Sequence, residues 1–140
     1  MVHAFDLHYL SSLPRLLPYG IYTLPECSMA GETEESLQKN QIPYYPGKAK
    51  YAENARGQIA GDIHGFLKLL FAAEDMKLLG VHAIGEQSTE IVHIGLSAMM
   101  LGAGADLFLQ SCYNYPTLGE LYKYATYNAL QAKAKSRRVT

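Results

Sequence analysis

Two short patterns combine residue types and spacings that could serve chemistry. The first is Tyr115-Pro116-Thr117-Leu-Gly-Glu120, which places a phenol and a carboxylate five residues apart. A carboxylate can orient a base, but a tyrosine with its usual pKa near 10 is a poor proton shuttle at neutral pH. The second is Glu90-x-x-His93, one half of the paired motif found in carboxylate-bridged metal sites. No second copy of it occurs, so the sequence predicts no metal site.

The carboxylate of Glu120 has two interpretations. Thr117 and Glu120 fit the capping box Thr-x-x-Glu, in which each side chain bonds the backbone N–H of the other residue at the start of a helix. A catalytic Glu120 would need a histidine partner, which this stretch lacks, so capping is favoured. Tyr115 is either a packing aromatic in a tight loop or a wall of a binding pocket.

Other candidate nucleophiles have little support. Cys27 has no histidine or basic neighbour in sequence, and Ser28 lies in Cys-Ser-Met-Ala-Gly, which is not the Gly-x-Ser-x-Gly elbow of hydrolases. The two cysteines, Cys27 and Cys112, form no Cys-x-x-Cys pair and are too few for a disulfide framework. They are interpreted as reduced thiols of a cytoplasmic protein.

Composition limits the class of protein. A chain of 140 residues that is 49% hydrophobic and 18% charged suits one folded domain. Its net charge of −1 gives no electrostatic case for nucleic acid binding. The longest uncharged run, residues 91–105, is too short to span a bilayer, and the first ten residues lack the pattern of a signal peptide. We therefore expect neither nucleic acid nor a membrane as a partner.

Hydrophobic patterning predicts an α+β fold, an antiparallel sheet with flanking helices. Residues 1–18 are expected to form an entry segment, 19–134 the folded domain and 135–140 a basic, solvated tail. A helix over 33–40 is expected to begin at Thr33 as N-cap and to end with Asn40 in the left-handed conformation. Further expectations are a strand at 19–25, an irregular or edge strand at 41–54, a connection at 54–65, a hairpin of strands 65–71 and 77–85, and helices at 88–104, 104–112 and 117–134.

The predicted helix at 88–104 is apolar over much of its circumference. Ile91, Ile94, Gly95 and Ala98 fall on one side at helical spacing, and Met99 lies on a neighbouring apolar side. So wide a stripe indicates packing on two sides. We expect the second side to face another subunit, with these five residues at the interface.

Four stretches carry a resemblance to a known family. They are GIYTLPECSMAGETEESL, NARGQIAGDIHGFLKLLF, KLLGVHAIGEQSTEIVHIG and YNYPTLGELYKYA, in that order along the chain. Together they resemble the C-terminal part of the soluble pyridine nucleotide transhydrogenases, a branch of the FAD-dependent pyridine nucleotide-disulfide oxidoreductases. The resemblance covers residues 19–129.

The resemblance implies that this chain is only the dimerisation domain, because the loops that hold FAD and NAD(P) lie upstream in the family. It implies a homodimer in which a loop reaches the partner's flavin. Where the disulfide reductases have an acid–base histidine, this chain has Tyr115, followed by Pro116 in an expected cis bond; Glu120 stands at the family's glutamate position. Gly20 and Ile21 match a stretch that approaches the nicotinamide ring.

Two hypotheses about function are compatible with these residues. Under the first, the parent enzyme transfers hydride between NADPH and NAD⁺ through FAD, while this chain alone binds no cofactor and is inactive. Under the second, the chain is a stand-alone interaction or regulatory module that binds full-length flavoprotein subunits.

Overall fold

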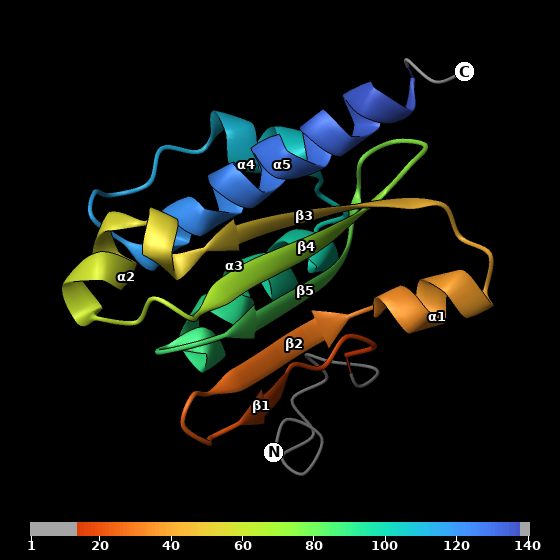
Figure 1. Cartoon of the computed structure of the whole chain (residues 1–140). Coiled ribbons are helices and arrows are strands. Elements are labelled where there is room, and N and C mark those ends of the chain that lie inside the picture. Colours follow the sequence, from red (N-terminus) through yellow and green to blue (C-terminus); the bar gives the residue numbers. More distant parts are fainter. Residues whose placement is uncertain (1–13, 138–140) are drawn as a thin grey trace, which may run out of the picture.

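A five-stranded antiparallel sheet organises the chain in the computed structural model, which describes residues 14–137 (Figure 1). The strand order is β1-β2-β5-β4-β3. This confirms the predicted α+β class. The elements are β1 (Tyr19–Ile21), β2 (Cys27–Gly31), α1 (Glu34–Lys39), β3 (Tyr44–Lys50), the 3₁₀ turn η1 (Tyr51–Glu53), α2 (Ala55–Ala60), β4 (Phe66–Ala72), β5 (Leu78–Ile84), α3 (Ser88–Met100), α4 (Ala105–Gln110), the 3₁₀ turn η2 (Leu118–Glu120) and α5 (Leu121–Ser136).

The register of the sheet separates its two faces. Gly47, Leu69, Val81 and Ala30 lie opposite one another across four strands, so they share a face. A Cβ on Gly47 would point at Ala125 of α5, and Val81 contacts the position that a Cβ on Gly95 of α3 would take. Helices α3 and α5 therefore cover the same face.

The next row along the strands belongs to the other face, which these two helices leave open. It contains Lys48, Lys68, His82 and Met29, again opposite one another in register. Near one end of this face, α1 is joined to β4 by an ion pair of 2.7 Å between Lys68 Nζ and Glu34 Oε1. The sheet thus has one face packed in the core and one available for contacts beyond it.

Several local predictions are confirmed. Thr33 caps α1 through a 3.1 Å bond from the N–H of Ser36 to its hydroxyl, and β4 and β5 form the predicted hairpin. The strand at 44–50 is the predicted edge strand. One detail is wrong: Asn40 keeps a φ of −87°, and the left-handed residue is Gln41, with φ of 54°.

Helix α2 lies where the sequence predicts a glycine-punctuated connection. Asn54 caps it by accepting from the N–H of Gly57, and Gly61 closes it with φ of +77°, a conformation that glycine adopts without strain. The helix has only six residues, too few for a hydrophobic period to stand out. Its Ala, Arg and Gln residues are good helix formers, and the Asn54 cap and the closing Gly61 set where it begins and ends.

Two predicted boundary segments lie partly outside the described residues. Residues 1–13 of the entry segment and 138–140 of the tail fall there, and residues 14–18 form neither helix nor strand. Helix α5 continues to Ser136 and so includes the first two residues of the segment predicted as a basic tail.

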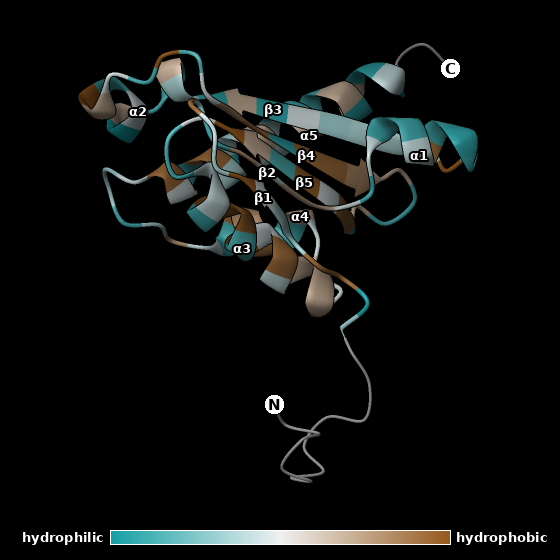
Figure 2. Ribbon diagram, turned by 90° about the horizontal axis from the view of Figure 1, so that it is seen from below, coloured by the Kyte–Doolittle hydropathy of each residue, from teal (hydrophilic) through white to brown (hydrophobic). Residues whose placement is uncertain are grey.

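Both apolar sides of α3 are covered within the chain for much of its length. Gly95 lies against Val81 of β5, and Ile91, Gly95 and Ala98 are all buried. Hydrophobic residues concentrate on α3 and the central strands, whereas α1 is largely hydrophilic (Figure 2). Ile91, Gly95 and Ala98 are thus covered by the chain itself, whereas Ile94 and Met99 stay partly exposed, and the interface with another subunit stays a prediction.

A buried hydroxyl joins α3 to α5. Tyr122 Oη donates to the carbonyl of Ile91 at 2.7 Å and accepts from the N–H of Gly95 at 3.0 Å. These are the two groups that an α-helix would join directly, since they lie four residues apart. The ring of Tyr122 also packs against Phe108, with centroids 5.1 Å apart. Through its hydroxyl and its ring, Tyr122 sets the spacing of α3, α4 and α5 at one point.

Gly95→Ala tests the closeness of α3 to the sheet. A Cβ there would lie 2.8 Å from Cγ1 of Val81, so overpacking should destabilise the fold by about 1–3 kcal/mol in urea unfolding. The double variant Gly95→Ala/Val81→Ala makes room for the new methyl group. It should therefore cost less than the sum of the single changes, by about 1 kcal/mol. Additive effects would show that this contact does not limit the packing.

Candidate functional site

The loop that carries Tyr115 and Pro116 joins α4 to η2. The Tyr115–Pro116 peptide is cis, as predicted. The side chain of Tyr115 is 76% exposed. A large aromatic ring so exposed contributes little to the packing of its own chain, so this loop presents its ring outward.

The carboxylate of Glu120 is hydrogen-bonded to a backbone N–H group. Its Oε2 accepts from the N–H of Thr117 at 3.3 Å, as one half of the predicted capping box. The hydroxyl of Thr117 also donates to the carbonyl of Asn114 at 2.7 Å. The capping interpretation of Glu120 is confirmed, and the stretch from Ser111 to Lys123 contains no histidine for it to orient.

Two side chains from the start of α2 hold the same loop. Asn54 Nδ2 donates to the carbonyl of Thr117 at 3.1 Å, and Arg56 Nε donates to the carbonyl of Pro116 at 3.2 Å. Sequence reasoning missed both residues, because these bonds join positions 60 or more residues apart. Only the Asn at a helix start gives a local signal, and that signal predicts a cap.

Gly20 and Ile21 lie on β1, an exposed edge strand. Ile21 is 58% exposed, and Gly20 lies beside Thr89 of α3. With Cys27, Met29 and other residues of β2 and β5 they line an apolar groove of about 380 Å³ on the open side of the sheet. The loop after β1 is tied to α3 by Glu26, whose Oε2 accepts from the hydroxyl of Thr89 at 2.7 Å.

The structure does not bring the two predicted cofactor-facing pairs together. Gly20 and Ile21 lie on β1 at one edge of the sheet, whereas the loop between α4 and α5 lies well away from it (Figure 1). The two pairs belong to two separate surfaces.

His82 is a partly buried residue on the open face of the sheet. Both of its ring nitrogens are enclosed, and neither has a hydrogen-bond partner. Burial, and after it the Lys68 cation, lowers the pKa of His82; Glu34 and Glu35 oppose the shift. The folded protein therefore favours the neutral imidazole.

The described residues offer no metal site. Residues 14–137 contain no group of three or more His, Cys, Asp or Glu side chains that could share an ion. His93 is exposed, and its Nδ1 lies 3.2 Å from the carbonyl of Glu90. None of the helices in this range has the length and apolar character of a membrane span.

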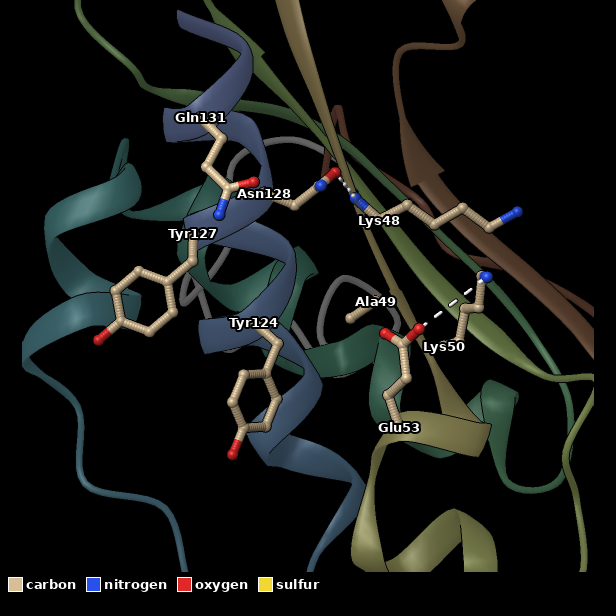
Figure 3. Close-up of a pocket in the computed structure, with 8 residues that line it drawn as sticks. All are labelled: Lys48, Ala49, Lys50, Glu53, Tyr124, Tyr127, Asn128 and Gln131. Carbon is tan, nitrogen blue, oxygen red and sulfur yellow. Dashed lines mark hydrogen bonds and ion pairs between the residues drawn. The ribbon is translucent and has the colours of Figure 1, made fainter. Parts of the chain in front are cut away.

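A polar groove of about 270 Å³ lies between β3 and α5 (Figure 3). Tyr124 and Tyr127 project from α5, and Asn128 Oδ1 accepts from the backbone N–H of Lys48 at 3.0 Å. Lys50 lies 3.9 Å from Glu53 in an exposed ion pair. The Asn128 bond satisfies an N–H on the free edge of the sheet, which protects this edge from pairing with another strand.

Comparison with known proteins identifies the domain. A family model described as pyridine nucleotide-disulphide oxidoreductase, dimerisation domain, matches residues 17–126. The chain belongs to this family. The antiparallel sheet and its helices are therefore those of a dimerisation domain.

Curated relatives of this dimerisation domain are soluble pyridine nucleotide transhydrogenases. The chain is 48% identical over 128 residues to the one from Mycobacterium tuberculosis (strain ATCC 25177 / H37Ra), covering 91% of this chain and 27% of that protein. It is 47% identical over 118 residues to the one from Hahella chejuensis, covering 81% and 25%. The chain thus spans about a quarter of the length of the curated relatives it matches.

Solved structures of more distant sequence share the fold. LpdA from Mycobacterium tuberculosis matches with a TM-score of 0.80 at 19% identity, over 90% of this chain and 28% of that one. The HOCl-induced flavoprotein disulfide reductase RclA from Escherichia coli also matches with a TM-score of 0.80 at 19% identity, over 89% and 30%. These likenesses concern the architecture of the dimerisation domain.

One surface of the dimerisation domain has the apolar, open shape of a contact site. A groove of about 490 Å³ lies between α3 and α4 and includes Ile94, Leu101 and Leu107. Leu101 is 82% exposed, and the neighbouring Met100 is 63% exposed. Exposed apolar side chains gathered in this way mark a surface whose burial against a partner lowers the free energy.

The neutral state of His82 predicts a pH dependence of stability. Because its folded pKa is lowered from the ordinary 6.5, the unfolded chain binds the additional proton. Stability from this residue is fully present above pH 6.5 and is lost as the pH falls through the lowered pKa of the folded state. His82→Gln should remove this slope, which is at most about 1.4 kcal/mol per pH unit.

Urea unfolding at a series of pH values measures this slope. His93→Gln is the matched control, because His93 is exposed on α3. A slope that survives His82→Gln, or that His93→Gln removes, would assign the titration to another group.

Proposed function

We propose that this chain is the dimerisation domain of an FAD-dependent soluble NAD(P)⁺ transhydrogenase, an oxidoreductase that moves hydride between NADPH and NAD⁺. The observation that carries the proposal is 48% identity over 91% of the chain to a protein of that name. Identity at this level, across the loop and both edges of the sheet, argues for the same branch of the family and not merely the same fold.

The Tyr115 loop supports a transhydrogenase over a disulfide reductase. Reduction of a disulfide requires a proton at the leaving thiolate, and an acid–base group near it. Tyrosine is a poorer proton shuttle than histidine at neutral pH, and the carboxylate of Glu120 accepts a hydrogen bond from the N–H of Thr117. Hydride exchange between two nicotinamides needs no thiol and no such pair.

The residues of this chain suit one side of a cofactor site but not the part that binds the cofactor's phosphates. The groove beside Gly20 and Ile21 is apolar, and its lining includes no lysine or arginine to meet a pyrophosphate. Bound FAD would supply the two-electron chemistry in the whole enzyme. Here Gly20 and Ile21 would border the nicotinamide, and Tyr115 and Pro116 would border the flavin of the partner.

We infer a homodimer that forms through the groove between α3 and α4. The placement of β1 and of the loop between α4 and α5 in different parts of the domain (Figure 1) supports this, since two copies could bring them to one cofactor site. Ile94 and Met99, which stay partly exposed, are the interface residues proposed from the sequence that remain accessible; Ile91, Gly95 and Ala98 support them from the core. The two unpaired thiols are in keeping with a cytoplasmic protein.

The proposal makes a prediction about activity. The purified 140-residue chain should be colourless and should not transfer hydride from NADPH to an NAD⁺ analogue. A chimera of the M. tuberculosis relative, with this chain in place of the segment it matches, should bind flavin and turn over. Visible spectra and a coupled absorbance assay measure both.

Two results would oppose the proposal. A yellow, active 140-residue chain would mean that it holds a complete site. An inactive but folded, flavin-loaded chimera would remove the transhydrogenase role. If the chain alone instead changed the activity of a full-length relative, the regulatory alternative would replace the first.

The dimer has its own test. Ile94→Glu should convert a dimer of the chain to a monomer in sedimentation velocity, because it places a charge in the apolar groove. Ile59→Glu is the control, since Ile59 is 67% exposed on α2, away from the groove. A monomeric wild-type chain at high concentration, or a dimer untouched by Ile94→Glu, contradicts this interface.

A further inference from the structure

The position of Tyr115 is set by its backbone. With 76% of its surface exposed, its side chain has too few contacts to fix it. Three carbonyls around it accept hydrogen bonds from side chains: Asn114 from Thr117, Pro116 from Arg56, and Thr117 from Asn54. Only the first of these donors belongs to the loop itself. The other two come from the start of α2, so the loop is held from outside.

Asn54 uses both ends of its amide. It is 2% exposed; its Oδ1 accepts from the N–H of Gly57 at 3.1 Å, and its Nδ2 donates to the carbonyl of Thr117 at 3.1 Å. An amide group fixed at both ends cannot rotate without leaving a buried polar atom unpaired. The cap of α2 and the anchor of the loop are thus one rigid group.

Arg56 adds a second, more exposed bond. Its Nε donates to the carbonyl of Pro116 at 3.2 Å, one residue from the Tyr115 ring. Arg56 and Asn54 lie two residues apart and bond consecutive carbonyls. The two donors therefore hold two consecutive peptide groups, 116–117 and 117–118, which limits how the loop can turn as well as how far it can move.

The anchor itself is closely packed and extensively hydrogen-bonded. A Cβ on Gly57 would lie 2.3 Å from the carbonyl of Tyr51, so α2 is pressed against η1. Tyr51 is buried, and its hydroxyl donates to the carbonyl of Glu86 at 3.1 Å. Asp62 accepts from the N–H of Glu86 at 2.8 Å and also from those of His64 and Gly65. Burial alone would raise the pKa of Asp62, but these three donors lower it.

This network reaches the other cofactor-facing surface. Glu86 lies just before α3, where Thr89 bonds Glu26 of the loop after β1. A continuous path of hydrogen bonds and short backbone steps therefore connects the Tyr115 loop, α2, the start of α3 and the β1–β2 loop.

We propose that Asn54 and Arg56 are positioning residues that hold the Tyr115–Pro116 loop in the orientation in which it meets the partner's cofactor site. The inference rests on the proposed function for what the loop meets, but not for how it is held. Neither residue touches a cofactor; both act through the carbonyls of Pro116 and Thr117.

The first experiment measures the loop in the 140-residue chain. Asn54→Asp keeps the acceptor for Gly57 but replaces the donor to Thr117 with a carboxylate oxygen, and Arg56→Ala removes the donor to Pro116. The ¹⁵N order parameters of Asn114, Tyr115 and Thr117 should fall from about 0.85 to below about 0.6. Gln58→Ala is the matched control: Gln58 also lies on α2, but it bonds the carbonyl of Ala52.

The second experiment uses the flavin-loaded chimera of the M. tuberculosis relative. Each loop variant should lower kcat about five-fold, the equivalent of one lost hydrogen bond, with flavin content and sedimentation unchanged. A role confined to folding would lower flavin content or dimer mass instead, and Gln58→Ala should change none of these.

The outcomes separate the two proposals. Unchanged order parameters in both loop variants would overturn the positioning role, whatever the chimera does. A loosened loop with undiminished kcat would show that the orientation does not matter for turnover, which also overturns it. A chimera inactive without any variant would defeat the proposed function, and the positioning role would then be decided by the order parameters. Arg56→Ala keeps the test valid if Asn54→Asp does not fold, because Arg56 is exposed.

Discussion

The hydroxyl of Tyr122 is the interaction on which the arrangement of this domain depends. It bonds the carbonyl of Ile91 and the N–H of Gly95, which sets α5 against α3 at the point where α3 lies closest to the sheet. Burial raises the pKa of Tyr122, so the group remains a neutral donor and acceptor. A phenylalanine at this position would keep the ring but leave two buried backbone groups without their shared partner.

This close packing on one face determines where the molecule can make contacts elsewhere. Because α3 and α5 cover the same side of the sheet, the other side presents the row from Lys48 to Met29 and the exposed β1 edge. Exposed apolar side chains lie both beside α3, around Leu101, and near β1, at Ile21 and Leu24. The proposed dimer contact and the two surfaces proposed to face cofactors can thus occupy different sides of one small domain without competing.

The sequence predicted the features that depend on neighbours along the chain. The Thr33 cap, the Thr117–Glu120 capping box and the β4–β5 hairpin each involve residues a few positions apart, so their patterns are legible. The wide apolar stripe of α3 was also correctly predicted, and part of it packs within the chain; that its second side faces another subunit stays a prediction. Hydrophobic periodicity indicates that a helix face is buried but not which element covers it. In α3 the sheet and Tyr122 cover the buried face.

The anchors of the Tyr115 loop lay beyond such reasoning for a physical reason. Asn54 has the signature of the cap of a short helix, which it is, but its second bond depends on a fold that brings Thr117 beside it from 63 residues away. The family resemblance identified the loop because its residues follow one another in the sequence. Asn54 and Arg56, which hold the loop, lie far from it in the sequence. Because the Tyr115 ring makes few contacts of its own, its position depends on the hydrogen bonds that hold the backbone of its loop. The residues that decide how this loop meets a partner are therefore found where its carbonyls point, and not among its own side chains.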